Sequence, residues 1–464
     1  MAVVTAVAPP TRRNVEAVLL VLALGVVLGA YALVGLARDD RVPPDLAAYG
    51  LGLAALVGVV HGVLRWRARY ADPTLLPIAT VLNGLGLVII HRLDLVEHRA
   101  FGATLAPKQL LWSAIGVVLA VVVLLAVRDH RVLSRFTYTA MAAGLGLLLL
   151  PLVPGLGSSI HGARIWIRLG SMSFQPGELA KICLALFFAG YLVTARDSLS
   201  LVGRRVLGLR LPRGRDLGPI LVAWALSLGV LIFERDLGTS LLFFGLFVAL
   251  LYVATERLSW IVIGLLLFFG GAFTAWTAFA HVQERVNIWL HPFDPHFAAS
   301  SYQLVQGLYG MASGGLLGTG LAQGRPNIVP YAESDFIVAS IGEELGLTGL
   351  FAIFLLYLVL VQRGMRTAIG VRDGFGKLLT AGLSFSMALQ VFVVAGGVTR
   401  LIPLTGLTMP LLAYGGSSLV SNWVIVGLLL RISDAARRPS PEIPATPVPS
   451  PAPTAPTEST EEAA

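Results

Sequence analysis

Residues 109–127 read QLLWSAIGVVLAVVVLLAV, a run without a charged side chain. A helix of this length crosses the roughly 30 Å hydrocarbon core of a bilayer and satisfies its own backbone polar groups. Similar runs lie on both sides of it, at 15–36, 45–64, 74–91, 137–153, 175–194, 217–233, 237–254, 258–280, 335–362, 377–398 and 411–430. The pattern predicts an all-α polytopic membrane protein with about 12 transmembrane helices.

The composition excludes other classes of protein. Of the 464 residues, 56% are hydrophobic and 13% are charged, whereas a soluble domain carries about 25% charged residues. The net charge of +8 comes largely from arginines in short loops between apolar runs, which predicts contact with membrane lipid and not with nucleic acid. Cys183 is the only cysteine, so an intramolecular disulfide and a cysteine-cluster metal site are excluded.

The basic residues also predict the orientation. An even number of spans places both termini on one side, and with that side inside, 22 of the 34 Lys and Arg residues fall in inside segments. This bias follows the positive-inside rule. We therefore expect a multi-pass protein of the cytoplasmic membrane with a cytoplasmic N-terminus (1–14), an N-terminal transmembrane pair (15–73), a transmembrane core (74–431) and a disordered cytoplasmic tail (432–464), which is rich in Pro, Ala, Thr, Ser and Glu.

Two predicted outside segments, 154–174 and 281–334, are longer than simple connections. The second has amphipathic apolar spacing, aromatic residues and a Gly-rich centre, which favours a large ordered extracellular loop. Within it, Asp294 stands in HPFDPHF. An Asp before Pro is most often a turn residue, and the flanking His291 and His296 form only a weak metal-site pattern. Arg285 is a candidate ligand for a phosphate or an acidic headgroup.

Charged residues also stand inside the apolar runs. Glu178 and Lys181, in FQPGELAKICLALFF, are three residues apart and share one helix face. They form either a structural ion pair or the polar floor of a substrate cavity, below a helix start that Gln175-Pro176 would cap or kink. Asp236 is interpreted as a helix N-cap. Glu343 and Glu344, roughly two turns into a predicted span, require polar partners.

Together these segments resemble the SEDS family (shape, elongation, division and sporulation), which includes RodA and FtsW. The matching blocks, in the family's order, are GARIWIRLGSMSFQPGELAKI, ERDLGTSLL, YQLVQGLYGMASGGLLGTGL, SDFIVASIGEELGLTG and PLTGLTMPLLAYGGSS. The resemblance implies a ten-helix core that begins near residue 74, with the two preceding helices as an extension. The N-terminal pair and NWVIVGLLLRISDAARRP are more similar to the RodA type of actinobacteria than to FtsW.

The resemblance implies a peptidoglycan glycosyltransferase that polymerises lipid II for cell elongation and shape. An acceptor sugar 4-hydroxyl attacks the donor anomeric carbon, and polyprenyl diphosphate leaves. The implied partners are a class B penicillin-binding protein and other elongation or division machinery. The alternatives are a flippase for lipid-linked precursors, in which Glu178 and Lys181 would be essential, and a non-catalytic scaffold for crosslinking enzymes.

The resemblance also assigns roles to residues. The family's essential acid corresponds to Asp294, which would deprotonate or orient the acceptor hydroxyl, and Asp335 is the reserve. Arg285 or a divalent cation (Mg²⁺ or Mn²⁺) would stabilise the diphosphate. The other expected contributors are the substrate-binding candidates Tyr302, Gln303, Arg164 and Asp335, the cavity pair Glu178 and Lys181, and the motif residues Gln175, Asp236, Glu343 and Ser417.

Overall fold

The structure is a computed structural model that describes residues 11–97, 103–160, 163–169, 172–200, 205–206, 209–210, 222, 225, 229, 234 and 236–439. Within these ranges, eleven helical segments are long and apolar enough to cross a membrane. They are α1 (Arg13–Asp39), α2 (Leu46–Arg67), α3 (Leu75–Val96), α4 (Ala106–Ala126), the continuous segment His130–Leu152, α6 (Pro176–Ser200), α8 (Leu237–Thr255), α9 (Leu258–Ala278), α13 (Gly346–Gly370), α14 (Gly374–Val398) and α15 (Gly416–Arg437). The segment His130–Leu152 consists of η1 (His130–Phe136), α5 (Thr137–Leu149) and η2 (Leu150–Leu152). The predicted helical membrane protein is confirmed.

Two predicted segments lie largely outside the described residues. The expected span at 217–233 lies outside the described residues except for residues 222, 225 and 229. The predicted tail begins too early, because α15 continues to Arg437 and buries Ser433 and Asp434. Asp434 accepts hydrogen bonds from Arg438 and from the backbone N–H of Tyr70, which hold this last turn in place. Residues 440–464 lie outside the described part of the chain.

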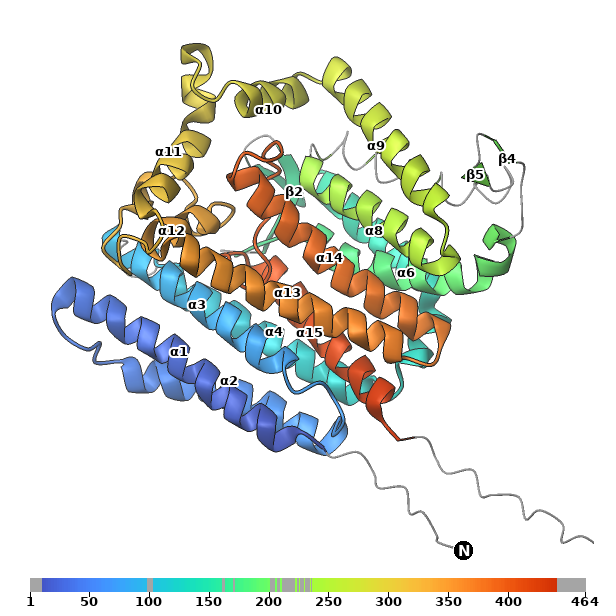
Figure 1. The fold of residues 1–464 in the computed structure, drawn as a ribbon, viewed down its shortest axis with the longest axis horizontal. Helices are drawn as coiled ribbons and strands as arrows, with labels where there is room; N and C mark the ends of the chain where they lie inside the picture. Colours follow the sequence, from blue (N-terminus) through green and yellow to red (C-terminus); the bar gives the residue numbers. More distant parts are fainter. Residues whose placement is uncertain are drawn as a thin grey trace, which may run out of the picture.

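The core helices pack in pairs around one continuous apolar cluster. α15 lies along α4, α5 along α6, and α13 along α14, while α6 and α14 both contact α8. The helices run side by side, with α3 between the N-terminal pair and the rest of the core (Figure 1). A close approach explains one glycine: a side chain at Gly116 of α4 would collide with the buried Trp423 of α15.

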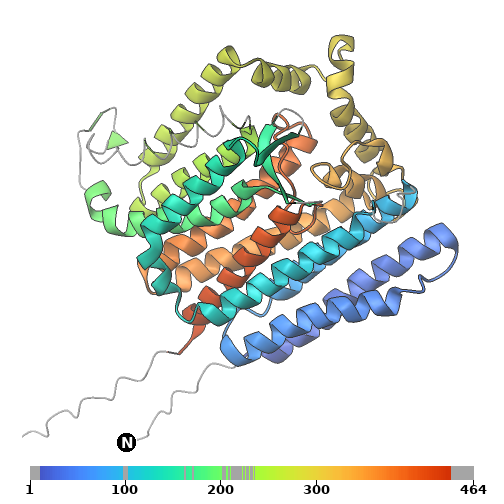
Figure 2. The same cartoon turned by 180° about the vertical axis from the view of Figure 1, so that it is seen from behind.

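The N-terminal pair forms an outer layer on this core (Figure 2). α1 packs along α3, and α2 packs along α4. The opposite faces expose apolar side chains, such as Val18, Leu22 and Leu51, as expected for lipid contact. A second apolar cluster joins the pair to α3 and to Ala322 of the Gly-rich segment, residues 311–324. The cluster consists of Val27, Tyr31, Val34, Leu53, Leu87, Val88 and Ala322.

The segments predicted to lie outside the membrane are structured at one end of the bundle (Figure 1). An antiparallel sheet contains β1 (Gly157–Ile160), β2 (Ala163–Leu169) and β3 (Met172–Phe174). The longer segment forms α10 (Ala280–Leu290), η4 (Pro295–Phe297), α11 (Ala298–Gly314) and η5 (Pro326–Ile328). A separate antiparallel pair of short strands, β4 (Arg205–Val206) and β5 (Leu209–Arg210), follows α6 and does not belong to these outside segments.

The prediction of one continuous span over 335–362 is wrong. The chain forms a short buried helix, α12 (Ile337–Glu344), and α13 starts after a break. At the break Gly346 has a φ of +66°, and a side chain there would collide with the backbone at Gly318. The Gly-rich segment supplies N–H groups to the free carbonyls of α12, from Thr319 to Glu343 at 2.9 Å and from Gly320 to Glu344 at 3.0 Å. Hydropathy alone does not reveal this contact.

Candidate active site

The position of α10 is fixed by the turn that follows α14. The guanidinium of Arg285 donates a hydrogen bond to the carbonyl oxygen of Leu404 at 2.9 Å. The indole N–H of Trp289 donates to the carbonyl oxygen of Arg400 at 3.1 Å. In return, Arg400 donates to the carbonyl oxygens of Trp289 and Leu290 at 2.9 and 3.0 Å. Arg400 therefore satisfies the last carbonyls of α10 and places a cation at the negative end of its dipole.

The reciprocal hydrogen bonds of Trp289 and Arg400 form a clamp on the end of α10. Asp294 lies just beyond this clamp, at the turn between α10 and α11. Its carboxylate caps η4 and accepts hydrogen bonds from the backbone N–H and the Nδ1 of His296 at 2.9 and 2.8 Å. Its side chain is 40% exposed. The backbone hydrogen bond from His296, followed by the side-chain bond, holds the pKa of Asp294 below its ordinary value. The carboxylate is therefore ionised at neutral pH and open to a ligand.

Asp335 has the opposite environment. It is half-buried, and its carboxylate accepts a hydrogen bond from the hydroxyl of Ser334 at 3.0 Å. Burial raises the pKa of Asp335 to about 6, although hydrogen bonds from Ser334 and Gln303 oppose this shift. Gln303 also donates to the carbonyl oxygen of Pro330 at 3.1 Å and so ties α11 to this turn. Tyr302, the neighbour of Gln303, is exposed.

The charge of Arg285 interacts with that of Asp335. Burial lowers the pKa of its guanidinium, while the charges of Asp236 and Asp335 raise it. The structure therefore brings Arg285, Asp236, Gln303 and Asp335 into one neighbourhood. Asp294 does not belong to it, since it lies at the exposed turn.

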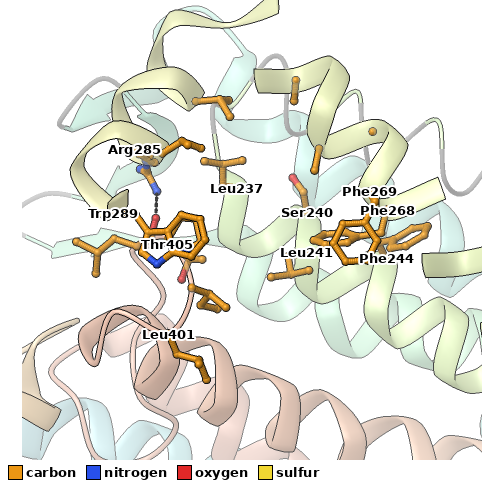
Figure 3. Close-up of a pocket in the computed structure, with 18 of the residues that line it drawn as sticks. Leu237, Ser240, Leu241, Phe244, Phe268, Phe269, Arg285, Trp289, Leu401 and Thr405 are labelled. Carbon is orange, nitrogen blue, oxygen red and sulfur yellow. Dashed lines mark hydrogen bonds between the residues drawn. The ribbon is translucent and has the colours of Figure 1, made fainter. Parts of the chain in front are cut away.

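An apolar pocket of about 370 Å³ lies beside Arg285, between α8, α9, α10 and the 401–405 turn. Arg285 and Trp289 stand at one end of it, and the rings of Phe244, Phe268 and Phe269 at the other (Figure 3). The remaining lining residues are mostly aliphatic. The pocket thus combines one cationic end with a long apolar wall.

The predicted pair of Glu178 and Lys181 is confirmed in α6. The Nζ of Lys181 lies 2.9 Å from Glu178, and both side chains are buried. Lys181 also donates to the amide oxygen of Gln390 on α14 at 2.8 Å. The amide nitrogen of Gln390 donates to Glu178 at 3.5 Å and to the carbonyl of Thr408 at 2.9 Å. The group therefore joins α6 to α14 and to the segment before α15.

Asp236 is an N-cap, as predicted. It begins α8 and accepts hydrogen bonds from the backbone N–H of Thr239 at 3.0 Å and from its hydroxyl at 2.5 Å.

Glu343 and Glu344 hold the Gly-rich segment. The buried Arg92 of α3 pairs with Glu344 at 2.5 Å and donates to the carbonyl of Gly324 at 2.6 Å. Glu344 also accepts from the N–H of Ala322, and Glu343 accepts from the N–H of Arg325 at 2.6 Å. Through these bonds the two carboxylates hold the backbone of residues 322–325 in place.

Three other predicted site residues lie on other elements of the fold. Arg164 is exposed on β2, Gln175 is half-buried just before α6, and Ser417 is buried in the first turn of α15. Three residues that form contacts here, Arg92, Gln390 and Arg400, were not among the predicted site residues. Arg92 and Gln390 are polar residues in or next to apolar runs, which is the signal that could have identified them.

The predicted divalent cation finds no matching ligand set in the part of the chain that the structure describes. There, no group of three or more His, Cys, Asp or Glu side chains is arranged to hold a metal ion.

The comparison with protein families decides the assignment. A family model described as "Cell cycle protein", covering FtsW, RodA and SpoVE, matches residues 73–438. The chain belongs to the FtsW/RodA/SpoVE family. The match begins where the predicted transmembrane core begins, so the N-terminal pair precedes the region that defines the family.

Individual relatives of the FtsW/RodA/SpoVE family cover most of the chain. The "Peptidoglycan glycosyltransferase RodA" of Mycobacterium tuberculosis is 50% identical over 437 residues, which are 93% of this chain and 92% of the relative. The protein of the same name from Mycobacterium leprae is 47% identical, covering 94% of each chain. "Stage V sporulation protein E" of Bacillus subtilis is 32% identical over 79% of this chain and 98% of its own.

Solved structures of similar proteins share the fold. A chain from a structure titled "Structural coordination of polymerization and crosslinking by a peptidoglycan synthase complex" matches with a TM-score of 0.64 and 26% identity, covering 79% of this chain and 98% of that chain. The Rod shape determining protein RodA of Thermus thermophilus matches with a TM-score of 0.53 and 26% identity, covering 78% and 96%.

Proposed function

We propose that this chain is a peptidoglycan glycosyltransferase of the RodA type, which polymerises lipid II into glycan strands during cell elongation. The observation that carries the proposal is the 50% identity over 437 residues with relatives of that name. The transmembrane bundle supports it, because a lipid-linked substrate reaches such an enzyme through the membrane. The group of acids, arginine and glutamine at one end of the bundle supplies the polar chemistry.

In the proposed reaction, the 4-hydroxyl oxygen of the acceptor sugar bonds to the anomeric carbon of the donor sugar. The bond from that carbon to the diphosphate oxygen breaks, and polyprenyl diphosphate leaves with the electron pair. Asp294 accepts the proton of the hydroxyl or orients it. Its ionised state supports this role, and catalytic contacts often form only when substrate is bound. General-base assistance contributes about 10²–10⁴ in rate.

Arg285 neutralises the leaving diphosphate in this proposal. A guanidinium presents several N–H donors in a planar arrangement that matches phosphate oxygens. In the described part of the chain, the guanidinium of Arg285 makes one hydrogen bond, to the carbonyl oxygen of Leu404. Preorganised charge of this kind stabilises a transition state because it needs no reorganisation during the reaction.

The proposal extends to location and partners. α1 begins and α15 ends at the same end of the bundle, away from α10, α11 and α12 (Figure 1). This arrangement and the arginine bias support cytoplasmic termini and a site at the outer face of the cytoplasmic membrane. The solved peptidoglycan synthase complex supports a class B penicillin-binding protein as partner.

The test is polymerisation of lipid II by the purified full-length chain together with its cognate penicillin-binding partner. We expect glycan strands from the wild type and none from a folded Asp294→Ala variant. Normal strand formation by Asp294→Ala would transfer the catalytic role to Asp335. Failure of the wild type, with an active partner and bound lipid II, would reject the enzymatic proposal.

The buried group of Glu178, Lys181 and Gln390 is the one observation that favours a second function, transport of a lipid-linked precursor. Transport of a fluorescent lipid II across vesicle membranes distinguishes the two functions. A transporter would depend on Glu178 and not on Asp294.

A further inference from the structure

We infer that a second pocket, between α5, α6 and the start of α14, binds the head group of an anionic phospholipid that carries hydroxyl groups, as phosphatidylglycerol does. The pocket has a volume of about 310 Å³. The inference goes beyond the proposed function and does not depend on it. It is carried by the position of the pocket, by the polar groups that line it and by the apolar surface beside it.

The pocket lies where membrane-spanning segments meet the membrane surface. It is lined by the first turns of the segment His130–Leu152, by the last turns of the span Pro176–Arg196 and by Phe375, which is buried at the start of α14. The head groups of a bilayer occupy the layer just outside its hydrocarbon core. We therefore expect phospholipid head groups at the level of this pocket.

The pocket belongs to the end of the bundle at which α15 ends. Asp72 accepts hydrogen bonds from Arg363, near the end of α13, and from Arg437, in the last turn of α15. α14 follows α13 after three residues, so its first turn lies at this end as well. With the orientation that the arginine bias supports, a phospholipid bound here belongs to the inner leaflet of the cytoplasmic membrane.

The charged groups of the pocket favour an anion. Among the described residues that line it, Arg135 is basic and none is acidic. Arg135 is exposed, and within the described ranges its guanidinium makes no hydrogen bond or ion pair. The acids of the adjoining turns have other partners, because Asp129 caps η1 and Asp373 pairs with His130 at 2.7 Å and with Arg131 at 3.4 Å. A free guanidinium binds phosphate oxygens through several N–H donors.

The hydroxyl groups of the pocket add a second requirement. Ser134, Thr137 and Thr194 line it, and each donates its hydroxyl hydrogen to a backbone carbonyl, at 2.7, 2.6 and 2.8 Å. Their oxygens therefore remain as acceptors. A phosphodiester has only acceptors and cannot bond to them, whereas the hydroxyl groups of a glycerol head group can donate to them. A phosphate joined to a polyol satisfies both Arg135 and these oxygens.

The surroundings favour a lipid over a soluble phosphate ester. Tyr138, which lines the pocket, is 66% exposed, and the neighbouring Phe136 is 54% exposed. Val193 also lines the pocket and exposes apolar surface. All three lie on candidate membrane spans, where exposed apolar side chains contact acyl chains and tyrosines gather at head-group level. Basic pockets between transmembrane helices on the cytoplasmic side are typical sites for anionic head groups.

Two threonines provide a matched pair of variants. Thr194 lines the pocket and Thr139 does not, and both are exposed on the helices that border it. Thr194→Trp therefore places an indole ring at the pocket, and Thr139→Trp makes the same change outside it. Arg135→Gln removes the cation of the pocket. Its control is Arg128→Gln, which removes an exposed arginine of the preceding loop that does not line the pocket.

The experiment titrates the purified full-length chain in a neutral detergent with phosphatidylglycerol that carries a fluorophore on one acyl chain, and it follows binding by fluorescence anisotropy. We expect Arg135→Gln and Thr194→Trp each to weaken binding by about tenfold or more. Arg128→Gln and Thr139→Trp should bind as the wild type does. Thermal unfolding establishes that each variant is folded. Equal binding by the two tryptophan variants, or by the two glutamine variants, would overturn the inference.

Competition by unlabelled compounds identifies the ligand. Phosphatidylglycerol should displace the labelled lipid at least about tenfold better than phosphatidylcholine, phosphatidic acid or glycerol 3-phosphate. Equal displacement by phosphatidylcholine would contradict recognition of an anion, and equal displacement by phosphatidic acid would contradict recognition of the head-group hydroxyls. Equal displacement by glycerol 3-phosphate would assign the pocket to a soluble anion. Because the assay contains no lipid II, its outcome is separate from that of the proposed function.

Discussion

Arg400 and Trp289 hold each other through reciprocal hydrogen bonds, in which each side chain donates to the other residue's carbonyl oxygen. The two residues are distant in sequence, and Arg400 takes a left-handed backbone conformation with a φ of +62° to reach this position. Their contact joins the turn after α14 to the last turn of α10. Because Asp294 follows α10 directly, this clamp sets where the Asp294 turn begins.

Loss of the clamp should reduce catalysis. We expect Arg400→Met to lower kcat for lipid II polymerisation by about tenfold, because a misplaced catalytic group can cost up to a hundredfold. Arg400→Lys should recover part of the rate. The exposed Arg366→Met serves as the control, and an equal loss in that variant would point to a general charge effect.

The pH dependence of the reaction distinguishes the two candidate acids. Asp294 has a lowered pKa, so it stays ionised as the pH falls from 7 to about 5. Asp335 has a pKa of about 6, so it takes up a proton over the same range. If Asp294 is the base, kcat/KM should remain nearly constant down to about pH 5. The measurement is a pH–rate profile of the wild type and of Asp335→Asn.

A loss of rate below about pH 6 in the wild type, together with no strand formation by a folded Asp335→Asn variant, would contradict the assignment to Asp294. The sign follows from the direction of the shift. A raised pKa keeps a carboxyl group protonated to higher pH, so a base with that pKa loses activity as the solution becomes more acidic.

The ion pair of Arg92 and Glu344 should contribute to stability. Both side chains are buried, so Arg92→Met leaves the Glu344 carboxylate without its partner. Removing one partner of a buried pair costs about 3–5 kcal/mol, and we expect a clear fall in the thermal unfolding temperature in detergent. The double variant Arg92→Met/Glu344→Met should regain most of the loss. A double variant as unstable as Arg92→Met would show that the effect lies in packing.

The group of Glu178, Lys181 and Gln390 should be architectural. Glu178→Gln keeps a polar side chain within reach of Lys181 and Gln390, so strand formation should stay within about threefold of the wild type. Loss of the charge opposite the buried Lys181 should lower the unfolding temperature, and Glu178→Ala should lower it further. The two variants are compared by polymerisation and by thermal unfolding. A stable Glu178→Gln protein that makes no strands would indicate that the charge itself takes part in the function.

Local features of the sequence predicted the fold and part of the site. Apolar runs identify spans because the bilayer selects on local composition alone. The N-cap of Asp236 and the pair of Glu178 and Lys181 depend on residues three positions apart, and both were predicted. The family motifs predicted the family that the comparisons confirm.

Contacts between distant segments could not be predicted in this way. Gln390 completes the Glu178 group from a helix far along the chain. The break at Gly346 depends on N–H donors from the Gly-rich segment. Because hydropathy does not detect such donors, it predicted one span where the structure has α12 and α13. The burial that raises the pKa of Asp335 likewise depends on how α11 packs.

The second apolar cluster has a consequence for any shortened form of the protein. Ala322 belongs to that cluster together with Val27 and Tyr31 of α1, and its N–H is bound by Glu344. A protein that lacks α1 and α2 would leave Ala322 and its neighbour Leu321 facing lipid or water on one side, while Glu344 still holds the backbone on the other. The N-terminal pair, which precedes the region that the family shares, therefore covers one side of the segment that leads into α12.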